Sequence, residues 1–160
     1  MDLIGPGPME PHFEDADHAV RNLHAQGHWV DLGSGAGFPG IALAAHHPKA
    51  HVLLVESRQK RALFLKRVIQ ESQLSNIELY HGRSEHLNQQ FDGVISRAYR
   101  KPLAYLEDAR RLSKSHAQTV LLLGGDNPFV PPDHWMIEED SIYTISTGSR
   151  RRLILCAKKA

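Results

Sequence analysis

The sequence predicts an α/β fold in which helices cover both faces of a mostly parallel sheet that ends in an antiparallel hairpin. Three observations support this prediction. Strand-like and helix-like segments alternate between residues 28 and 123, as they do when helices connect parallel strands. Two strand-like segments are continuous apolar runs, which is typical of strands buried on both faces. The C-terminal segment instead holds two strand-like runs separated by a short turn, which indicates a hairpin.

The first elements follow a Pro- and Gly-rich N-terminal segment. One helix is expected at 14–24 and a strand at 28–32. A glycine-rich stretch leads into a helix at 39–46, and the apolar run HVLLVE at 51–56 predicts a buried strand. Residues 58–72 place apolar side chains at helical spacing with basic residues on the opposite face, so a second crossover helix is expected there.

The remaining elements continue the alternation before it ends in the hairpin. Proline at the first turn is a natural start for one further helix, and TVLLL predicts a fifth buried strand. The expected elements are strands at 76–80, 91–96 and 119–123, a helix at 102–112, and hairpin strands at 142–146 and 152–157 joined by Thr147-Gly148-Ser149.

Composition narrows the possible classes of function. The formal net charge is only +1, so any surface that attracts nucleic acid must be local. The single cysteine, Cys156, excludes an internal disulfide and a cysteine-based zinc cluster. The eleven histidines are scattered. His24 and His28 are at helical spacing, but Gly27 interrupts any helix there, so no metal site is expected. The sequence has no signal peptide and no apolar run near ~18 residues, which favours a cytoplasmic protein without a membrane segment.

The glycine-rich stretch VDLGSGAGFPGIALA is the strongest motif. A dinucleotide-binding fingerprint, G-x-G-x-x-G, fails from Gly33 and fits only when it begins late, at Gly35. The pattern Asp-x-Gly-x-Gly-x-Gly, which is typical of S-adenosylmethionine-dependent methyltransferases, fits without adjustment. It falls on Asp31, Gly33, Gly35 and Gly37. Nicotinamide or flavin binding, and a tight turn without a ligand, are the alternatives.

Two acids complete this interpretation. Glu56 ends the second strand, where a two-oxygen acceptor could take both hydroxyls of a ribose. Asp31 would order the loop or contact the ammonium group of the cofactor. In an open α/β sheet the ligand sits outside the carboxyl ends of the strands, which is where these residues are expected.

A longer set of segments resembles one family. GSGAGFPGIALA, VESRQKRALFLKRV, GRSEHL and FDGVISRA occur in the order and spacing of the small-subunit ribosomal RNA guanine-N7 methyltransferases, also called glucose-inhibited division protein B. The resemblance is close from Val30 to Tyr99. It implies a class I S-adenosylmethionine-dependent methyltransferase fold, which is Rossmann-like with seven strands, and methyl transfer to guanine N7 of 16S ribosomal RNA.

The resemblance also assigns residues. The family's cofactor contacts fall on Gly33, Phe38, Ser84, Glu85 and Arg97, and Arg97 is the candidate catalytic residue. Together with the motif, the predicted cofactor-binding residues are Asp31, Gly33, Ser34, Gly35, Gly37, Phe38, Glu56, Ser84, Glu85 and Arg97.

The chain lacks the motifs of two other classes of nucleic-acid methyltransferase, which agrees with methyl transfer to guanine N7. Guanine N7 carries an in-plane lone pair, so alignment rather than a general base is needed. Enzymes that methylate exocyclic amines place an Asn/Asp-Pro-Pro-aromatic motif after the fourth strand, where this chain has Ser96-Arg97-Ala98-Tyr99. Cytosine-C5 enzymes need a nucleophilic cysteine, whereas Cys156 is better explained as a small buried side chain in the last strand.

Basic residues concentrate after the second, third and fourth strands. Arg58 and Lys60 stand in the first turn of a helix against its dipole, which phosphate contact would explain. A merely solvated basic face is the alternative, as is a packing role for Tyr99 in place of base stacking. The predicted substrate-binding residues are Arg58, Lys60, Arg61, Arg83, Tyr99, Arg100 and Lys101.

The chain is expected to form one methyltransferase domain over 1–160, with a short N-terminal segment (1–27), a cofactor-binding core (28–125) and a hairpin region (126–160). It departs from the family by a shorter N-terminal segment and by Gly124 where the family has lysine. The expected partner is ribosomal RNA or the small ribosomal subunit, and a monomer is favoured. A methyltransferase of another RNA or of a small molecule, or a cofactor-binding module without turnover, remain as alternatives.

Overall fold

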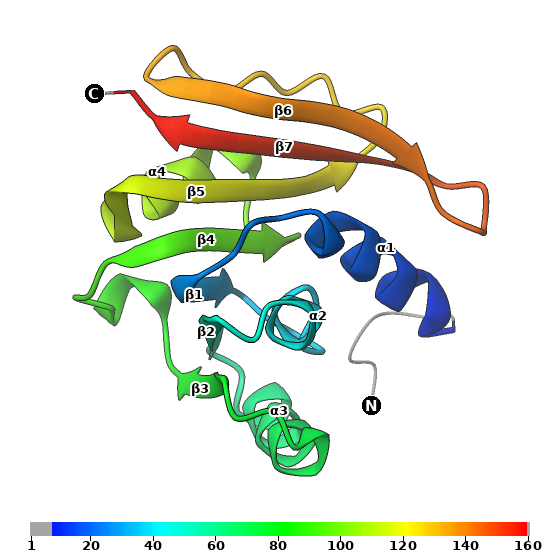
Figure 1. Cartoon of the computed structure of the whole chain (residues 1–160), viewed down its shortest axis with the longest axis vertical. Helices are drawn as coiled ribbons and strands as arrows, with labels where there is room; N and C mark the ends of the chain where they lie inside the picture. Colours follow the sequence, from blue (N-terminus) through cyan, green and yellow to red (C-terminus); the bar gives the residue numbers. More distant parts are fainter. Residues whose placement is uncertain (1–7, 160) are drawn as a thin grey trace.

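The computed structural model describes residues 8–159, which form a seven-stranded sheet with the strand order β3-β2-β1-β4-β5-β7-β6 (Figure 1). Strands β1 to β5 are parallel, whereas β7 runs antiparallel to both of its neighbours, β5 and β6. The predicted α/β fold with a C-terminal antiparallel hairpin is therefore confirmed. The strands are β1 (Gly27–Leu32), β2 (Ala50–Glu56), β3 (Ile77–His81), β4 (Phe91–Arg97), β5 (Ser113–Gly124), β6 (Trp135–Thr144) and β7 (Arg150–Lys158).

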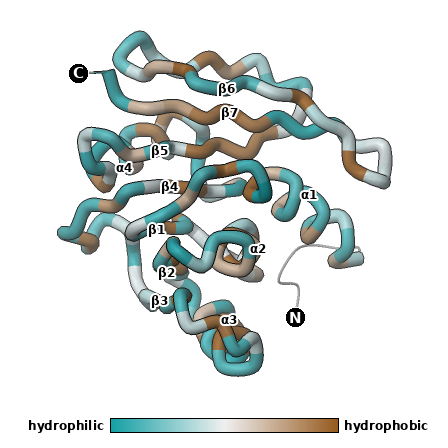
Figure 2. Tube along the Cα trace, in the orientation of Figure 1, coloured by the Kyte–Doolittle hydropathy of each residue, from teal (hydrophilic) through white to brown (hydrophobic). Residues whose placement is uncertain are grey.

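Helices cover both faces of this sheet. The core on one face joins α1, α2 and α3 to the sheet, and the core on the other face is built mainly by α4. Apolar residues follow the central strands, while the outer sides of the helices are mostly polar (Figure 2). The helices are α1 (Glu10–Arg21), α2 (Gly40–His46), α3 (Gln59–Ser72) and α4 (Pro102–Leu112), with a short 3-10 helix η1 (Ser84–His86).

Close packing in the middle of the sheet depends on one large and one small residue. The Trp29 ring on β1 is 1% exposed and lies over Gly93 on β4. A Cβ built at Gly93 would stand 2.2 Å from the indole, so any larger residue there would displace the ring. Since β1 and β4 are the central neighbours, this contact fixes the strands whose ends carry the glycine-rich loop.

Three boundaries differ from the sequence prediction by four residues or more, and the others differ by three at most. Helix α1 begins at Glu10 rather than residue 14, because Pro11 occupies its first turn, where proline costs no hydrogen bond. Strand β5 begins at Ser113, directly where α4 ends. Strand β6 begins at Trp135, well before the predicted start, because its acidic middle (Glu138, Glu139) lies on the exposed edge of the sheet and hides the apolar alternation.

Two further predictions from the sequence can be examined in the described residues. Cys156 is fully buried in β7, as expected of a small apolar side chain. Between residues 8 and 159, no helix is long and apolar enough to cross a membrane.

Candidate functional site

The glycine-rich loop connects β1 to α2 at the carboxyl edge of the sheet. Gly33 has φ +69°, and a Cβ there would lie 2.6 Å from the Tyr99 ring. Gly35 has φ +58°, but the space before it is open, with only Gly33 O and Arg61 Nη1 near 4 Å. The loop therefore needs glycine for two different reasons, which are close packing at Gly33 and a bare, left-handed backbone beside open space at Gly35.

Ser34 ties this loop to the next strand. Its Oγ donates to the Asp31 carbonyl (2.9 Å) and accepts from the Val55 amide (3.1 Å), while its own amide donates to the Val55 carbonyl (3.0 Å). The side chain is almost fully buried. Ser34, a predicted cofactor residue, thus holds the loop against β2 through its side chain.

Asp31 lies beneath the loop and is fully buried. Its Oδ2 accepts from the Gly40 amide at the start of α2 (2.9 Å), and its Oδ1 has no hydrogen-bond partner among the described residues. Burial raises the pKa of this carboxyl to about 7. Asp31 does not line either cavity described below, so the structure supports ordering of the loop, one of its two predicted roles.

Glu56 links the loop to the start of α3. Its Oε2 accepts from the Gly35 amide (3.1 Å) and its Oε1 from the Arg58 amide (2.7 Å). The residue is only 4% exposed, yet it lines a cavity. A buried two-oxygen acceptor therefore stands where the sequence placed the ribose contact.

Two cavities lie along this edge of the sheet. The smaller one, of 310 Å³, lies at the ends of β2 and β3, and the larger one, of 680 Å³, lies at the ends of β1, β4 and β5. Five residues line both and form a shared wall: Gly33, Arg61, Ala98, Tyr99 and Arg100. The two cavities therefore form one groove with two parts, a shape suited to an extended ligand beside a second one.

The smaller cavity collects the predicted contacts after β3. Ser84 and Glu85 stand in η1 beside Arg83. Arg111 of α4, which the sequence did not single out for the site, donates to the carbonyls of Ser84 (2.7 Å) and Leu87 (2.8 Å). This arginine holds η1 in place from another element, and no local pattern identifies such a contact.

Tyr99 forms the wall between the cavities. Its hydroxyl lies 2.5 Å from Ser84 Oγ and donates to Asp108 (3.2 Å), while its ring packs on Gly33. The Arg100 guanidinium lies 5.0 Å from the ring centroid and forms ion pairs with Glu85 and Asp108. Tyr99 thus has the packing role that the sequence left as an alternative, and Arg100 is largely neutralised.

The other predicted substrate-binding cations differ from Arg100 in their ion pairs. Among residues 8–159, five of them form no ion pair with an acidic side chain: Arg58, Lys60, Arg61, Arg83 and Lys101. Arg58, Arg61 and Arg83 line the cavities, whereas Lys60 and Lys101 lie outside them. The rim therefore carries a local positive charge that the net charge of the chain hides.

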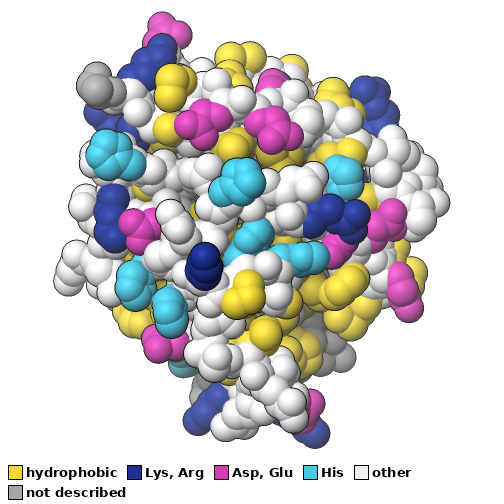
Figure 3. All heavy atoms as spheres, in the orientation of Figure 1, with side chains coloured by type: hydrophobic (Ala, Val, Ile, Leu, Met, Phe, Trp, Pro, Cys, Tyr) yellow, Lys and Arg dark blue, Asp and Glu magenta, His cyan; other side chains and the backbone are white. Residues whose placement is uncertain are grey.

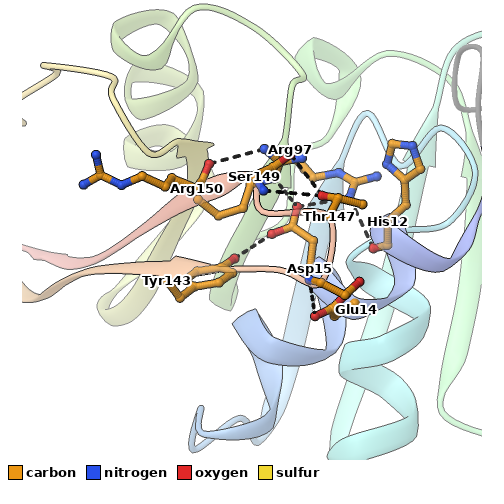
Figure 4. Close-up of polar contacts among 10 residues, drawn as sticks. His12, Glu14, Asp15, Arg97, Tyr143, Thr147, Ser149 and Arg150 are labelled. Atoms are coloured by element: carbon orange, nitrogen blue, oxygen red, sulfur yellow. Dashed lines mark hydrogen bonds and ion pairs between the residues drawn. The ribbon is translucent and has the colours of Figure 1, made fainter.

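Arg97 and Phe38 line the larger cavity, while Gly37 of the loop lines neither cavity. Arg97 ends β4 and pairs with Asp15 of α1, and Asp15 also accepts from Tyr143 of β6 (Figure 4). Phe38 meets Phe13 of α1 edge to face. The structure thus brings α1 to the site.

Metal and thiol chemistry find no support in the described part of the chain. Histidine side chains lie across the middle of the face shown in Figure 3, but residues 8–159 contain no group of three metal-ligating side chains. His46 pairs with Asp17, and His18 stacks on Tyr143. Burial raises the pKa of the Cys156 thiol to about 12, which excludes a reactive thiolate near neutral pH.

The family is settled by comparison with known sequences. The family model described as rRNA small subunit methyltransferase G matches residues 8–129. The chain belongs to this family. It is therefore an S-adenosylmethionine-dependent methyltransferase of ribosomal RNA, and the nicotinamide and flavin alternatives are set aside.

Individual relatives agree with the family. The chain is 30% identical over 156 residues to ribosomal RNA small subunit methyltransferase G of Pseudomonas putida (strain GB-1), covering 93% of this chain and 72% of the relative. The enzyme of the same name from Yersinia pseudotuberculosis (strain YPIII) is 48% identical over 86 residues, 52% of this chain and 42% of that one.

Solved structures show the same fold at low identity. TYW2 from M. jannaschii, in complex with AdoMet, has a TM-score of 0.74 at 13% identity and covers 99% of this chain and 81% of that one. A SAM-dependent methyltransferase from Aquifex aeolicus has a TM-score of 0.67 at 14% identity, with 93% of both chains covered. The class I methyltransferase fold predicted for the rRNA small subunit methyltransferase G family is confirmed.

Proposed function

We propose that this chain transfers the methyl group of S-adenosylmethionine to N7 of a guanine in 16S ribosomal RNA, acting as a monomer on the small ribosomal subunit in the cytoplasm. The observation that carries the proposal is the two-part groove. A smaller cavity with a buried carboxylate opens, past the shared wall at Tyr99, into a larger cavity with a basic rim. One part suits the cofactor and the other part suits the methionine end of the cofactor together with a purine.

The residues around the smaller cavity fit the adenosine half of the cofactor. Glu56 offers two carboxylate oxygens for vicinal hydroxyls, and Ser84 and Glu85 lie at the far side for the adenine edge. Glu56 also holds the amide of Gly35, which lines the larger cavity, and the open space before Gly35 leaves room that any side chain at this position would occupy. S-adenosylmethionine supplies an electrophilic methyl group when it is bound, and the protein groups place and orient it.

The larger cavity suits a nucleophile that needs no deprotonation. Its one acidic lining residue among those described, Asp15, is already held by Arg97, Arg151 and Tyr143 and is not free to act as a base. The lone pair of guanine N7 attacks without losing a proton first, so no general base is required. Arg97 is the candidate catalytic residue because it lines this cavity at the end of β4.

Recognition of the RNA is assigned to the basic rim. Arg58, Arg61 and Arg83 line the groove without acidic partners among residues 8–159, and Lys60 and Lys101 extend the rim. Such cations contact phosphates and fix the position of the RNA without reading its sequence.

The test is methyl transfer from labelled S-adenosylmethionine to three acceptors: naked 16S ribosomal RNA, intact small subunits and transfer RNA. The expected result is label in one ribosomal acceptor, recovered as N7-methylguanosine after digestion to nucleosides. Label in another nucleoside would replace the N7 assignment. No labelled RNA, with cofactor binding intact, would overturn the proposal in favour of a small-molecule acceptor or a module without turnover.

A further inference from the structure

Asp15 is the most deeply buried charged group on the wall of the larger cavity, at 3% exposed. Both of its oxygens are engaged. Oδ1 accepts from the Tyr143 hydroxyl at 2.7 Å, and Oδ2 lies 3.3 Å from Arg97 Nη1 and 3.4 Å from Arg151 Nε (Figure 4). The three donors come from β6, β4 and β7, so this one carboxylate joins α1 to three strands.

Arg97 is held from the same helix twice. Its Nη1 donates to Asp15 Oδ2 and to the His12 carbonyl, both at 3.3 Å. Only 19% of the Arg97 side chain is exposed, although the residue stands at the end of a strand beside a cavity. A long side chain fixed by two acceptors has lost its rotamer freedom before any ligand arrives, which is the condition for preorganised recognition.

The charges in this cluster do not cancel. Two guanidinium groups share one carboxylate, which leaves one positive charge on the cavity wall. Burial and Arg97 lower the pKa of His12, so its ring adds no charge at neutral pH, and burial raises the pKa of Tyr143, which stays a neutral donor. Glu14, the neighbouring acid, turns away and accepts from Ser146. The wall is therefore suited to one anionic group of a ligand.

We propose that Asp15 is a positioning residue, which holds the Arg97 guanidinium against the cavity wall so that it meets the carboxylate of the methionine part of the cofactor. Arg151 adds a second guanidinium group to this wall beside the single carboxyl group of Asp15. The inference rests on the proposed function, which places the methionine end of the cofactor in the larger cavity lined by Arg97, and it adds the residues of α1 and β7 that hold Arg97 there.

Glu14 provides a matched control. Its Oε1 accepts from the Ser146 amide (2.8 Å) and its Oε2 from the Ser146 hydroxyl (2.5 Å), so it joins α1 to the end of the same hairpin. It does not line either cavity. Glu14→Gln therefore weakens the junction between α1 and the hairpin without disturbing Arg97, whereas Asp15→Asn affects both.

The experiment is calorimetric titration of two ligands into the full chain. S-adenosylhomocysteine carries the amino acid carboxylate, and 5′-methylthioadenosine lacks it. We expect Asp15→Asn to weaken the binding of S-adenosylhomocysteine about tenfold, which is the usual effect of losing a charge-assisted contact. The binding of 5′-methylthioadenosine should weaken less than about twofold. Glu14→Gln should change the affinity for either ligand by less than about twofold. In an Arg97→Gln background, Asp15→Asn should cause no further loss, because residues that act through one another are not additive.

Equal weakening of the two ligands by Asp15→Asn, or no weakening of either, would overturn the assignment. If Asp15→Asn does not fold, Tyr143→Phe is used in its place, because it removes one hydrogen bond from the same carboxylate. It should weaken the binding of S-adenosylhomocysteine alone, by about threefold. An unselective Tyr143→Phe would then contradict the proposal. No RNA enters these titrations, so the proposed RNA acceptor can fail while the role of Asp15 is still decided.

Discussion

The two cavities are built from the sequence in different ways. The smaller one is lined by residues between Gly33 and Arg100, and its main contacts follow a motif in which each residue has a fixed spacing from a strand end. The larger one also needs α1 and the hairpin, where Asp15 and Tyr143 are 128 positions apart. Local motifs specify the first cavity, whereas only the tertiary fold assembles the second. Substitutions in the loop motif and substitutions in the tertiary contacts should therefore have different effects.

The largest effect is expected from Gly35→Val. The side chain would fill the open space before Gly35, which lines the larger cavity, and would force φ +58° on a β-branched residue, so we expect binding of S-adenosylmethionine to weaken more than about 100-fold. Calorimetry measures this loss. Gly148→Val is the matched control, since it imposes φ +80° in the hairpin turn with nothing within 4 Å. Equal affinity of the two variants would show that Gly35 does not face the cofactor.

An effect on stability rather than on binding is expected from the buried acid under the loop. The pKa of Asp31 is about 7 in the folded protein against an ordinary 3.8, so the folded state holds this proton more tightly than the unfolded chain. Its contribution to the free energy of unfolding is complete below pH ~4 and is lost as the pH rises through ~7, by on the order of 4 kcal/mol.

Asp31→Asn removes this titration and keeps an oxygen for the Gly40 amide. Urea unfolding of both proteins at several pH values between ~4.5 and ~7.5 should show wild type losing stability relative to the variant as the pH rises, because all other carboxyl groups are common to both. A constant difference across this range would mean that Asp31 does not titrate there.

The smallest effect concerns the basic rim. Arg83 forms no ion pair with any described acidic side chain, whereas Arg100 pairs with Glu85 and Asp108. Arg83→Gln should lower the slope of log affinity for ribosomal RNA against log salt by about 0.7, the value for one phosphate contact in a single strand. Arg100→Gln should lower it less. Filter binding at several salt concentrations measures both, and a larger change for Arg100 would assign the phosphate contact to the paired arginine.

The fold was largely predictable because its signals are local. The apolar runs of β2 and β5 and the turn at Gly148 each reveal an element within a few residues. Strand β6 was predicted too short because it is an edge strand, where acidic side chains replace the alternation that identifies inner strands. Its length is fixed by pairing with β7 rather than by its own sequence.

The candidate site was predictable to the extent that it follows strand ends. Glu56 was found because it ends the buried strand β2, and Ser84 was found because the segment after β3 resembles the family. Asp15 and Arg111 were not predicted as site residues, because each acts on a distant element, Asp15 on β4 and β6 and Arg111 on η1. The rim cations also looked alike in sequence, and only the structure separates Arg100, with its acidic partners, from Arg83.

The shared wall at Tyr99 has a consequence for ligand design. Gly33, Ala98 and Tyr99 line both cavities, so the adenosine of the cofactor and the purine of the RNA would lie on opposite sides of this wall. A single molecule with adenosine on one side of Tyr99 and a purine on the other could occupy both cavities through a short linker. Each half would raise the effective concentration of the other, so that two weak fragments would combine into one strong inhibitor.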